Sequence, residues 1–248
     1  MMLCYIKQLK YCAIILAAGK GSRLGADVPK PLAKIKGKPI IQYIVHSFLN
    51  FKNIQIGIVI NNNSPIINSI KSKCTFIFQN KAKGTGHAVK CCLEFIKQFD
   101  YTFISVGDSP LISYQSLYKM FINHINSDID CSFLTADFPA KYPYASIIRN
   151  KKGDIIKCVE QGDAGQSERN VKEKLSSHYL IRSKLIIEYI DLIKVNKNTK
   201  EEYFTDIINI LIKENKIIEG YKLKDYKELI GINTHLDMIE IKNSMNND

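Results

Sequence analysis

The stretch LAAGKGSRLG, residues 16–25, directly follows an apolar run of strand length. Its small residues let backbone N–H groups approach a polyphosphate closely, and Lys20 and Arg23 add positive charge. The glycines run G-x-G-x-x-x-G, unlike the G-x-G-x-x-G of dinucleotide-binding folds, and no G-K-[S/T] follows at P-loop spacing. The stretch therefore predicts a phosphate-binding loop of another kind, placed at the end of a strand.

A second short motif, Pro29-Lys30-Pro31-Leu32, follows this loop. Two prolines fix the path of the backbone and hold one lysine between them. A lysine placed in this way can reach a phosphate group as a compact point charge. The two motifs together are a stronger indication of phosphate binding than a glycine-rich turn alone.

Apolar runs of strand length alternate with segments of helical period over most of the chain, which is typical of an α/β fold. We predict strands at 12–17, 54–60, 74–79, 101–107 and 131–137, with one helical face formed by Ile41, Ile44, Val45, Phe48 and Leu49 and another by Ala88, Cys92, Phe95 and Phe99. The expected fold is a Rossmann-like, mainly parallel sheet flanked by helices.

The pattern changes after Pro143. Segments 144–149 and 154–160 are strand-like and are joined by a turn-rich sequence, which predicts a hairpin. A polar stretch over 161–174 is expected to form a surface loop or short helix. Further elements are expected near 175–181 (strand), 183–195 and 201–215 (helices), 217–223 (strand) and after Thr234 (helix). We expect a single domain over 1–248 with a small inserted β lobe at about 140–180.

Composition narrows the class of partners. Lys and Arg outnumber Asp and Glu by 35 to 24 among 248 residues, which suits anionic ligands. The lysines are spread along the chain, and no nucleic-acid-binding signature appears, so no nucleic-acid surface is expected. The seven cysteines show no CxxC spacing and the five histidines no HExxH motif, so we expect reduced cysteines and no zinc site.

The N-terminal region imitates a short signal peptide, because Lys7 and Lys10 precede an apolar run. That run leads directly into the glycine-rich loop, where it is better explained as a strand. No apolar stretch approaches the roughly 18 residues of a membrane helix. We therefore expect a cytoplasmic protein that does not insert into a membrane.

Three polar residues stand where strands or loops end. Asp108 follows an apolar strand at the carboxyl edge of the predicted sheet, where open α/β sheets bind ligands, and its carboxylate could bind Mg²⁺ or simply cap a loop. Gln79 could pair with a nucleobase edge or simply end a strand. Asn233 could serve as a helix N-cap beside Thr234.

The run LAAGKGSRLGADVPKPL closely resembles the signature of sugar-1-phosphate nucleotidyltransferases, and of the uridyltransferase part of N-acetylglucosamine-1-phosphate uridyltransferase in particular. Further motifs of this family recur in order along nearly the whole chain. They are Gln79 with Gly84-Thr85-Gly86-His87-Ala88, Val106-Gly107-Asp108-Ser109-Pro110-Leu111-Ile112, Glu160, Glu202-Tyr203-Phe204-Thr205-Asp206-Ile207 and Gly231-Ile232-Asn233.

The resemblance implies a nucleotide-diphospho-sugar transferase fold and assigns roles to fifteen residues. It implies catalytic roles for Arg23, at the pyrophosphate, and Lys30, at the α-phosphate; nucleotide binding by Leu16, Ala17, Ala18, Gly19, Gln79, Gly84, Thr85 and Gly107; sugar binding by Ala145, Glu160 and Ser176; and Mg²⁺ binding by Asp108 and Asn233. His87 is left without a role, because a histidine near a helix N-terminus is more often structural than catalytic.

The implied reaction joins an NTP, UTP in particular, to a sugar 1-phosphate, N-acetylglucosamine 1-phosphate in particular, and releases pyrophosphate. Such a product serves nucleotide-sugar and cell-envelope polysaccharide synthesis. The attacking phosphate oxygen is already anionic, so no general base is needed. The task of the site is then to position the substrates and to neutralise their charge with Mg²⁺, Arg23 and Lys30.

Two departures from the family pattern affect the sugar side. Tyr144-Ala145-Ser146 stands in place of Tyr-Gly-Arg, and Ser176-Ser177-His178 in place of Asn-Thr-Gly, with one extra residue after Glu160. Mannose or glucose 1-phosphate, or an alcohol phosphate joined to CTP, therefore remains an alternative. A non-catalytic nucleotide-sugar sensor is an alternative of another class. The absence of a hexapeptide period leads us to expect no C-terminal β-helix acetyltransferase domain.

Overall fold

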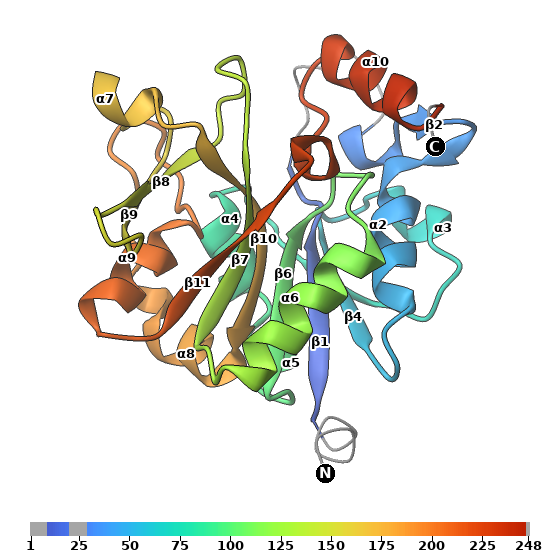
Figure 1. Ribbon diagram of the computed structural model, residues 1–248. Helices are drawn as coiled ribbons and strands as arrows, with labels where there is room; N and C mark the ends of the chain where they lie inside the picture. The colour runs from blue at the N-terminus through green and yellow to red at the C-terminus, as the bar shows by residue number, and fades with distance from the viewer. Residues whose placement is uncertain (1–8, 20–28, 247–248) are drawn as a thin grey trace.

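A mixed sheet with helices on both faces organises the chain in the computed structural model, which describes residues 9–19 and 29–246 (Figure 1). Seven strands follow the order β11-β7-β10-β6-β1-β4-β5, and β8 and β9 extend from β10. The strands are β1 (Tyr11–Leu16), β4 (Gln55–Ile60), β5 (Thr75–Phe78), β6 (Tyr101–Val106), β7 (Cys131–Asp137), β8 (Ala145–Arg149), β9 (Ile155–Val159), β10 (Glu173–Arg182) and β11 (Ile218–Leu223).

Four of the six neighbouring pairs along the seven-strand path are parallel, as the sequence predicts. β1 pairs in parallel with β4 and β6, β4 with β5, and β7 with β11. The exception is β10, which runs antiparallel to β6, β7 and β8. β10 follows the β8–β9 hairpin and the single-turn helix α7 (Gln166–Arg169), and it pairs with β8 at Lys174–Ser146 and Leu175–Ala145.

Helices cover the two faces of the sheet. The α-helices besides α7 are α2 (Ile40–Leu49), α3 (Ile66–Ser69), α4 (Thr85–Lys90), α5 (Leu93–Ile96), α6 (Tyr114–Asn126), α8 (Ser183–Tyr189), α9 (Asp206–Lys213) and α10 (His235–Ser244). Short 3₁₀ turns form η2 (Lys30–Leu32), η3 (Ile190–Leu192) and η4 (Tyr226–Leu229), and β2 (Lys34–Ile35) and β3 (Lys38–Pro39) form a separate small hairpin.

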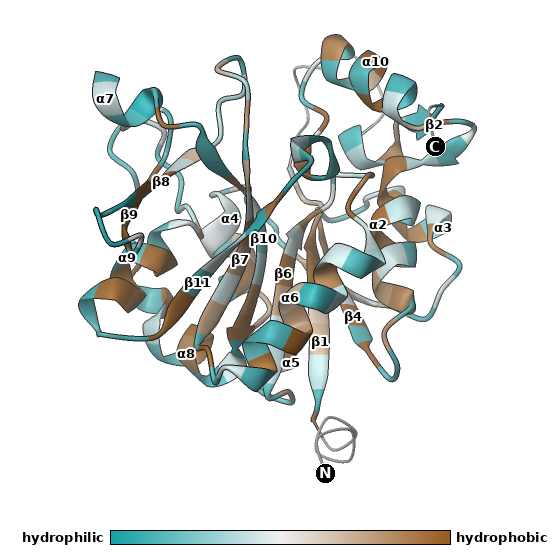
Figure 2. Ribbon diagram, viewed as in Figure 1, coloured by the Kyte–Doolittle hydropathy of each residue, from teal (hydrophilic) through white to brown (hydrophobic). Residues whose placement is uncertain are grey.

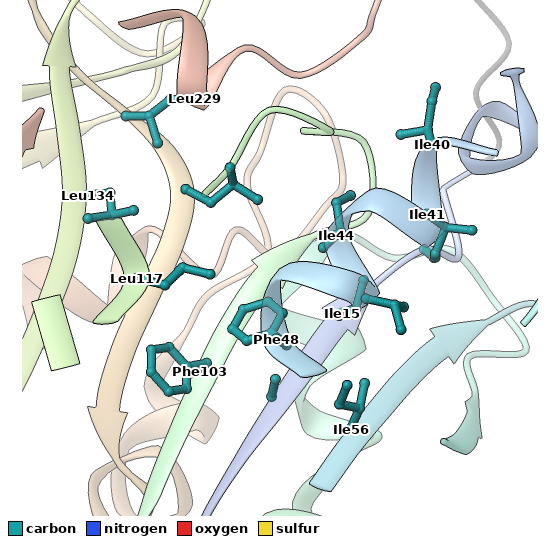
Figure 3. Packing of buried hydrophobic residues seen from close by; sticks show 14 of the residues in the cluster. Ile15, Ile40, Ile41, Ile44, Phe48, Ile56, Phe103, Leu117, Leu134 and Leu229 are labelled. Atoms are coloured by element: carbon teal, nitrogen blue, oxygen red, sulfur yellow. The ribbon is translucent and has the colours of Figure 1, made fainter. Parts of the chain in front are cut away.

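Two hydrophobic clusters pack against opposite faces of the sheet. Neighbouring strand residues such as Phe103 and Ile104 belong to different clusters, because successive side chains of a strand point to opposite faces. Figure 3 shows one cluster, in which Ile44 and Phe48 of α2 lie beside Ile15 of β1. α2, α6 and η4 contribute to this cluster, and α4, α8 and α9 contribute to the other.

The helix α6 shows why these residues fold as they do. Ser113 caps it by accepting a hydrogen bond from the Ser116 backbone N–H at 3.1 Å. Its buried side chains Leu117, Phe121 and His124 recur at helical spacing, and the ribbon alternates teal and brown in Figure 2. His124 Nδ1 lies 2.8 Å from the Ser132 hydroxyl of β7, and burial lowers the pKa of His124 to about 4.

Most predicted elements are found with small shifts of their ends, and the β8–β9 hairpin confirms the pattern after Pro143. The helix expected over 201–215 begins only at Asp206, as α9. One expected helix is divided. The apolar face over 88–99 is split between α4 and α5, because the Cys92 N–H bonds the Val89 carbonyl, three residues back, at 2.9 Å. No helix in the described part of the chain is long and apolar enough to span a membrane.

Candidate active site

A pocket of about 600 Å³ lies at the carboxyl ends of β1, β5 and β6. From β1 the chain proceeds to β4 and β5 on one side and then returns to β6 on the other, so β1 and β6 flank the point where the strand order reverses. Open α/β sheets bind ligands at such a point. The described residues lining the pocket are Leu16, Ala17, Ala18, Gly19, Lys30, Pro31, Gln79, Ala82, Gly84, Thr85, Ala88, Val106, Gly107, Asp108, Glu201 and Asn233.

Eleven of the fifteen residues singled out from the sequence belong to this lining. Arg23 lies outside the described residues. Ala145, Glu160 and Ser176, the three predicted sugar-binding residues, are not part of the lining. The structure therefore brings together the predicted nucleotide and metal residues, while the predicted sugar residues lie elsewhere in the fold.

The floor of the pocket depends on a close approach of the ends of β1 and β6. The Gly107 N–H donates to the Leu16 carbonyl at 2.8 Å. A Cβ atom at Gly107 would lie 2.9 Å from that same oxygen and 3.1 Å from Ala17 Cβ. Glycine is thus required here for packing, since any side chain would push the two strand ends apart.

The segment after β5 is locked to a distant part of the chain. Gly84 has φ +100°, and a Cβ there would lie 2.4 Å from the Glu202 carbonyl oxygen. That carbonyl accepts a 2.8 Å hydrogen bond from the Gly86 N–H, and Thr85 Oγ1 accepts one from the Phe204 N–H at 2.8 Å. The Gly-Thr-Gly motif and the Glu202–Phe204 segment therefore form one wall.

Gln79, directly after β5, is a buried polar residue of this wall, with 3% of its surface exposed. Its Nε2 lies 3.1 Å from the Gly84 carbonyl oxygen and 2.9 Å from His87 Nδ1. Its backbone N–H is bonded to the Ile60 carbonyl at 2.9 Å. Gln79 is therefore held by the chain through both its backbone N–H and its side-chain amide.

The two predicted metal ligands meet at a single cationic group. Lys30 Nζ donates to Asp108 Oδ2 and, at 2.8 Å, to Asn233 Oδ1. The side chains of Lys30 and Asp108 are 13% and 22% exposed, so the ion pair is partly withdrawn from water. Three segments, η2, the loop after β6 and the loop before α10, converge here.

The Gly231–Asn233 segment is fixed against Asp108 by its backbone. The Ile232 N–H donates to the Asp108 carbonyl at 2.9 Å, and the Gly231 N–H donates to the Tyr144 hydroxyl at 2.8 Å. A Cβ at Gly231 would lie 2.9 Å from Asp108 Oδ1. The cap of α10 is Thr234, and Asn233 keeps its side-chain oxygen for Lys30.

The oxygen pair of Asp108 and Asn233 fits a Mg²⁺ ion. Carboxylate and amide oxygens are hard ligands of the kind Mg²⁺ takes, one or two from protein and the rest from water and phosphate. The Lys30 ammonium between them shows that the position attracts a cation. Among the described residues no group of three or more His, Cys, Asp or Glu side chains could hold a metal ion.

The predicted sugar residues have partners within the chain. Ser176 is 4% exposed, and its hydroxyl donates to the Leu229 carbonyl. Glu160 accepts from the Thr205 hydroxyl; burial is the main cause that raises the pKa of Glu160 above its usual value, with the charge of Asp206 adding to it. A register shift in β10 lies between Leu175 and Tyr179, beside Ser176, and Ser177 there has φ 58°.

A buried pair lies on β6 and β10 near Asp108. His178 Nδ1 is 2.6 Å from the Ser105 hydroxyl, and both residues are nearly inaccessible. Burial lowers the pKa of His178 to about 4, while the charge of Asp108 opposes the shift. His178 is therefore neutral at physiological pH.

Sequence reasoning missed Ala82 and Glu201 of the lining and the contact of His87 with Gln79. Ala82 and Glu201 each lie just before a motif recognised in the sequence, and this nearness could have indicated that they line the pocket. Nothing in the sequence indicates the contact of His87 with Gln79, because it depends on how α4 begins.

Known proteins resemble this chain in sequence. Residues 13–178 match the MobA-like NTP transferase domain. The bifunctional protein GlmU of Streptococcus pyogenes serotype M3 is 33% identical over 223 residues, which make up 89% of this chain and 48% of that protein. GlmU of Streptococcus agalactiae serotype V is 34% identical over 223 residues, 89% of this chain and 49% of that protein. The chain thus spans about half the length of these curated relatives.

Solved structures share the fold at lower sequence identity. A UDP-glucose pyrophosphorylase in complex with UDP-glucose superposes with a TM-score of 0.78 and 20% identity, covering 97% of this chain and 99% of that one. A CMP:2-keto-3-deoxy-manno-octonic acid synthetase in complex with CTP gives a TM-score of 0.68 and 15% identity over 96% and 99%.

Proposed function

The chain belongs to the MobA-like NTP transferase family, and from this premise we propose that it joins a nucleoside triphosphate to a sugar 1-phosphate with release of pyrophosphate. The proposed nucleotide is UTP and the proposed sugar phosphate is N-acetylglucosamine 1-phosphate. GlmU, the name its curated relatives carry, describes bifunctional proteins, and the proposal concerns the part that this chain matches.

The observation that carries the proposal is the contact of Lys30 with Asp108 and Asn233 inside the pocket. A pair of oxygens that attracts a cation, in the same pocket as Leu16–Gly19, suits a substrate that brings both a metal ion and a chain of phosphates. When bound there, Mg²⁺ would neutralise phosphate charge and help to orient the triphosphate.

The proposed reaction needs no proton transfer. An oxygen of the sugar phosphate forms a bond to the α-phosphorus, and the bond from this phosphorus to the bridging oxygen of the β-phosphate breaks, with the electron pair leaving on pyrophosphate. Lys30 would leave its two oxygen partners to contact the α-phosphate, where negative charge accumulates in the transition state. Arg23 is proposed to stabilise the leaving pyrophosphate.

The base end of the nucleotide is proposed to lie between the loop after β1 and Gln79. Backbone groups of Leu16–Gly19 and the side-chain amide of Gln79 supply hydrogen-bonding groups there, and Gly84 and Thr85 form the adjoining wall. A side-chain amide at this position can hydrogen-bond to the edge of a pyrimidine.

The sugar end is proposed to involve Ala145, Glu160 and Ser176. Glu160 can accept from sugar hydroxyl groups, and Ala145 can offer its backbone N–H. Ser176 donates to the Leu229 carbonyl, so its hydroxyl is left as an acceptor. Glucose and mannose 1-phosphate are therefore included in the test beside N-acetylglucosamine 1-phosphate.

The test is a measurement of pyrophosphate release with four NTPs against these three sugar 1-phosphates in the presence of Mg²⁺. We expect the fastest release with UTP and N-acetylglucosamine 1-phosphate. Lys30→Met should lower this rate by about a hundredfold, the usual effect of removing one stabiliser of developing charge. Lys34→Met, an exposed lysine four residues away, is the matched control and should keep the rate. If no pair releases pyrophosphate while the protein still binds a nucleotide sugar, the chain is a sensor and the proposal is wrong.

A further inference from the structure

The side-chain amide of Gln79 can be oriented without ambiguity. Its terminal nitrogen position lies 3.1 Å from the Gly84 carbonyl oxygen. A carbonyl oxygen can only accept a hydrogen bond, so the group facing it must be the NH₂ and not the amide oxygen. The hydrogen-bonding partner therefore fixes which way the amide points.

His87 takes the second hydrogen of this NH₂ group. Its Nδ1 lies 2.9 Å from Gln79 Nε2. Since Nε2 is a donor here, Nδ1 is the acceptor, and the ring is the neutral tautomer with its proton on the other nitrogen. His87 can reach Gln79 because α4 begins at Thr85, directly after the positive-φ turn at Gly84, which brings its first turn back beside β5.

The amide oxygen of Gln79 is what remains for a ligand. Both NH₂ hydrogens have acceptors within the chain, and Gln79 belongs to the pocket lining. An oxygen without hydrogens can only accept. A base that meets it through a ring nitrogen must therefore carry a hydrogen on that nitrogen.

We propose that His87 is a positioning residue that determines base specificity: together with the Gly84 carbonyl it holds the Gln79 amide oxygen toward ring position 3 of the base, so that the site selects uracil over cytosine. Uracil has an N–H at ring position 3, whereas neutral cytosine has a lone pair there, and two acceptors would face each other. This inference rests on the proposed nucleotidyltransferase function and deepens it, because it derives the choice of base from a hydrogen-bond chain within the protein.

Two substitutions of equal shape test the role of His87. Asn and Leu side chains have nearly the same outline, but only the Asn Oδ1 can replace the histidine Nδ1 as an acceptor. Dissociation constants for UTP and CTP with Mg²⁺ are measured by calorimetry in the wild type, His87→Asn and His87→Leu. We expect the preference for UTP over CTP, taken as the ratio of their dissociation constants, to fall about tenfold in His87→Leu, the equivalent of one hydrogen bond. His87→Asn should keep the wild-type preference.

Three results would overturn the inference. The preference could survive in His87→Leu, it could fall equally in both variants, or the wild type could bind UTP and CTP alike. Binding of neither nucleotide by the wild type would instead contradict the proposed function.

A measurement on the wild type covers the case in which His87→Leu does not fold. NMR of the nucleotide-free protein reports the protonation of each ring nitrogen of His87 and the exchange of the Gln79 NH₂ protons, assigned with Gln79→Met. An unprotonated Nδ1 and slowly exchanging NH₂ protons are expected. A protonated Nδ1 at neutral pH would contradict the proposed role, whatever the protein binds.

Discussion

Replacing Lys30 by methionine should make the nucleotide-free protein bind a divalent cation more tightly, even though the same change should slow turnover. The ammonium group donates to Asp108 and Asn233, the two oxygens proposed to hold Mg²⁺. A metal ion can enter between these oxygens only after both contacts are broken. Methionine keeps most of the length of the side chain and removes its charge and its hydrogen bonds.

The size of the effect follows from these contacts. Hydrogen bonds to charged groups contribute about 1.5–3 kcal/mol each. Since Asp108 is 22% exposed and therefore partly screened by water, we take the range for one such bond as the total for both contacts. At 1.4 kcal/mol per factor of ten, the dissociation constant should fall by about 10- to 100-fold.

The assay is titration of Mn²⁺, which shares the oxygen-ligand preference of Mg²⁺ and is visible by electron paramagnetic resonance. Lys34→Met controls for the loss of one positive charge from the molecule, and Asp108→Asn should bind Mn²⁺ weakly in either background. If Lys30→Met binds Mn²⁺ no more tightly than the wild type, the ammonium does not compete with a metal ion, and Asp108 and Asn233 are not the ligands.

Three further predictions concern stability. Gly84→Ala should lower the free energy of unfolding by about 2–3 kcal/mol in urea denaturation, because a Cβ there meets the Glu202 carbonyl at φ +100°; Gly162→Ala, at a position with open space, should not, and equal losses would refute this reasoning. Because the pKa of Glu160 is raised in the folded protein, this carboxyl group ionises at lower pH in the unfolded chain. The free energy of unfolding should therefore fall as the pH rises above about 4.5, and Glu160→Gln should remove this fall. A Gln variant with the same pH profile would contradict the burial argument. Because the pKa of His124 is lowered to about 4 in the folded protein, this ring binds a proton at higher pH in the unfolded chain. The free energy of unfolding should therefore decrease as the pH falls from about 6.5 to about 4, and His124→Gln should reduce this decrease. An unchanged slope would exclude His124 as its source.

The fold was predictable to the extent that each element carries its own hydrophobic pattern. The strands around the pocket are short apolar runs with clear ends, and their predicted positions are confirmed within one or two residues. The antiparallel direction of β10 was not predictable in this way, because pairing direction depends on the connection that precedes a strand and not on its composition. The division of the helix over 88–99 likewise depends on one backbone hydrogen bond, from Cys92 to Val89.

The site was predictable where residues are tied to a motif. Leu16–Gly19, Lys30, Gln79 and Asp108 were singled out in separate motifs, and the structure places all of them in the pocket lining. The contact between Gln79 and His87 was not predictable, because it depends on the angle at which α4 leaves Gly84. The role of Arg23, which lies outside the described residues, stays a prediction, as do the sugar-binding roles of Ala145, Glu160 and Ser176.

The loop before α10 makes the proposed metal site depend on residues from both ends of the chain. Asn233 lies 203 residues after Lys30, and its segment is held by Asp108 and by Tyr144, which belong to the middle of the chain. A chain that ends before residue 233 would lack one of the two oxygens proposed to hold the metal ion. Such a fragment should therefore bind a metal-bound triphosphate more weakly than the full chain does.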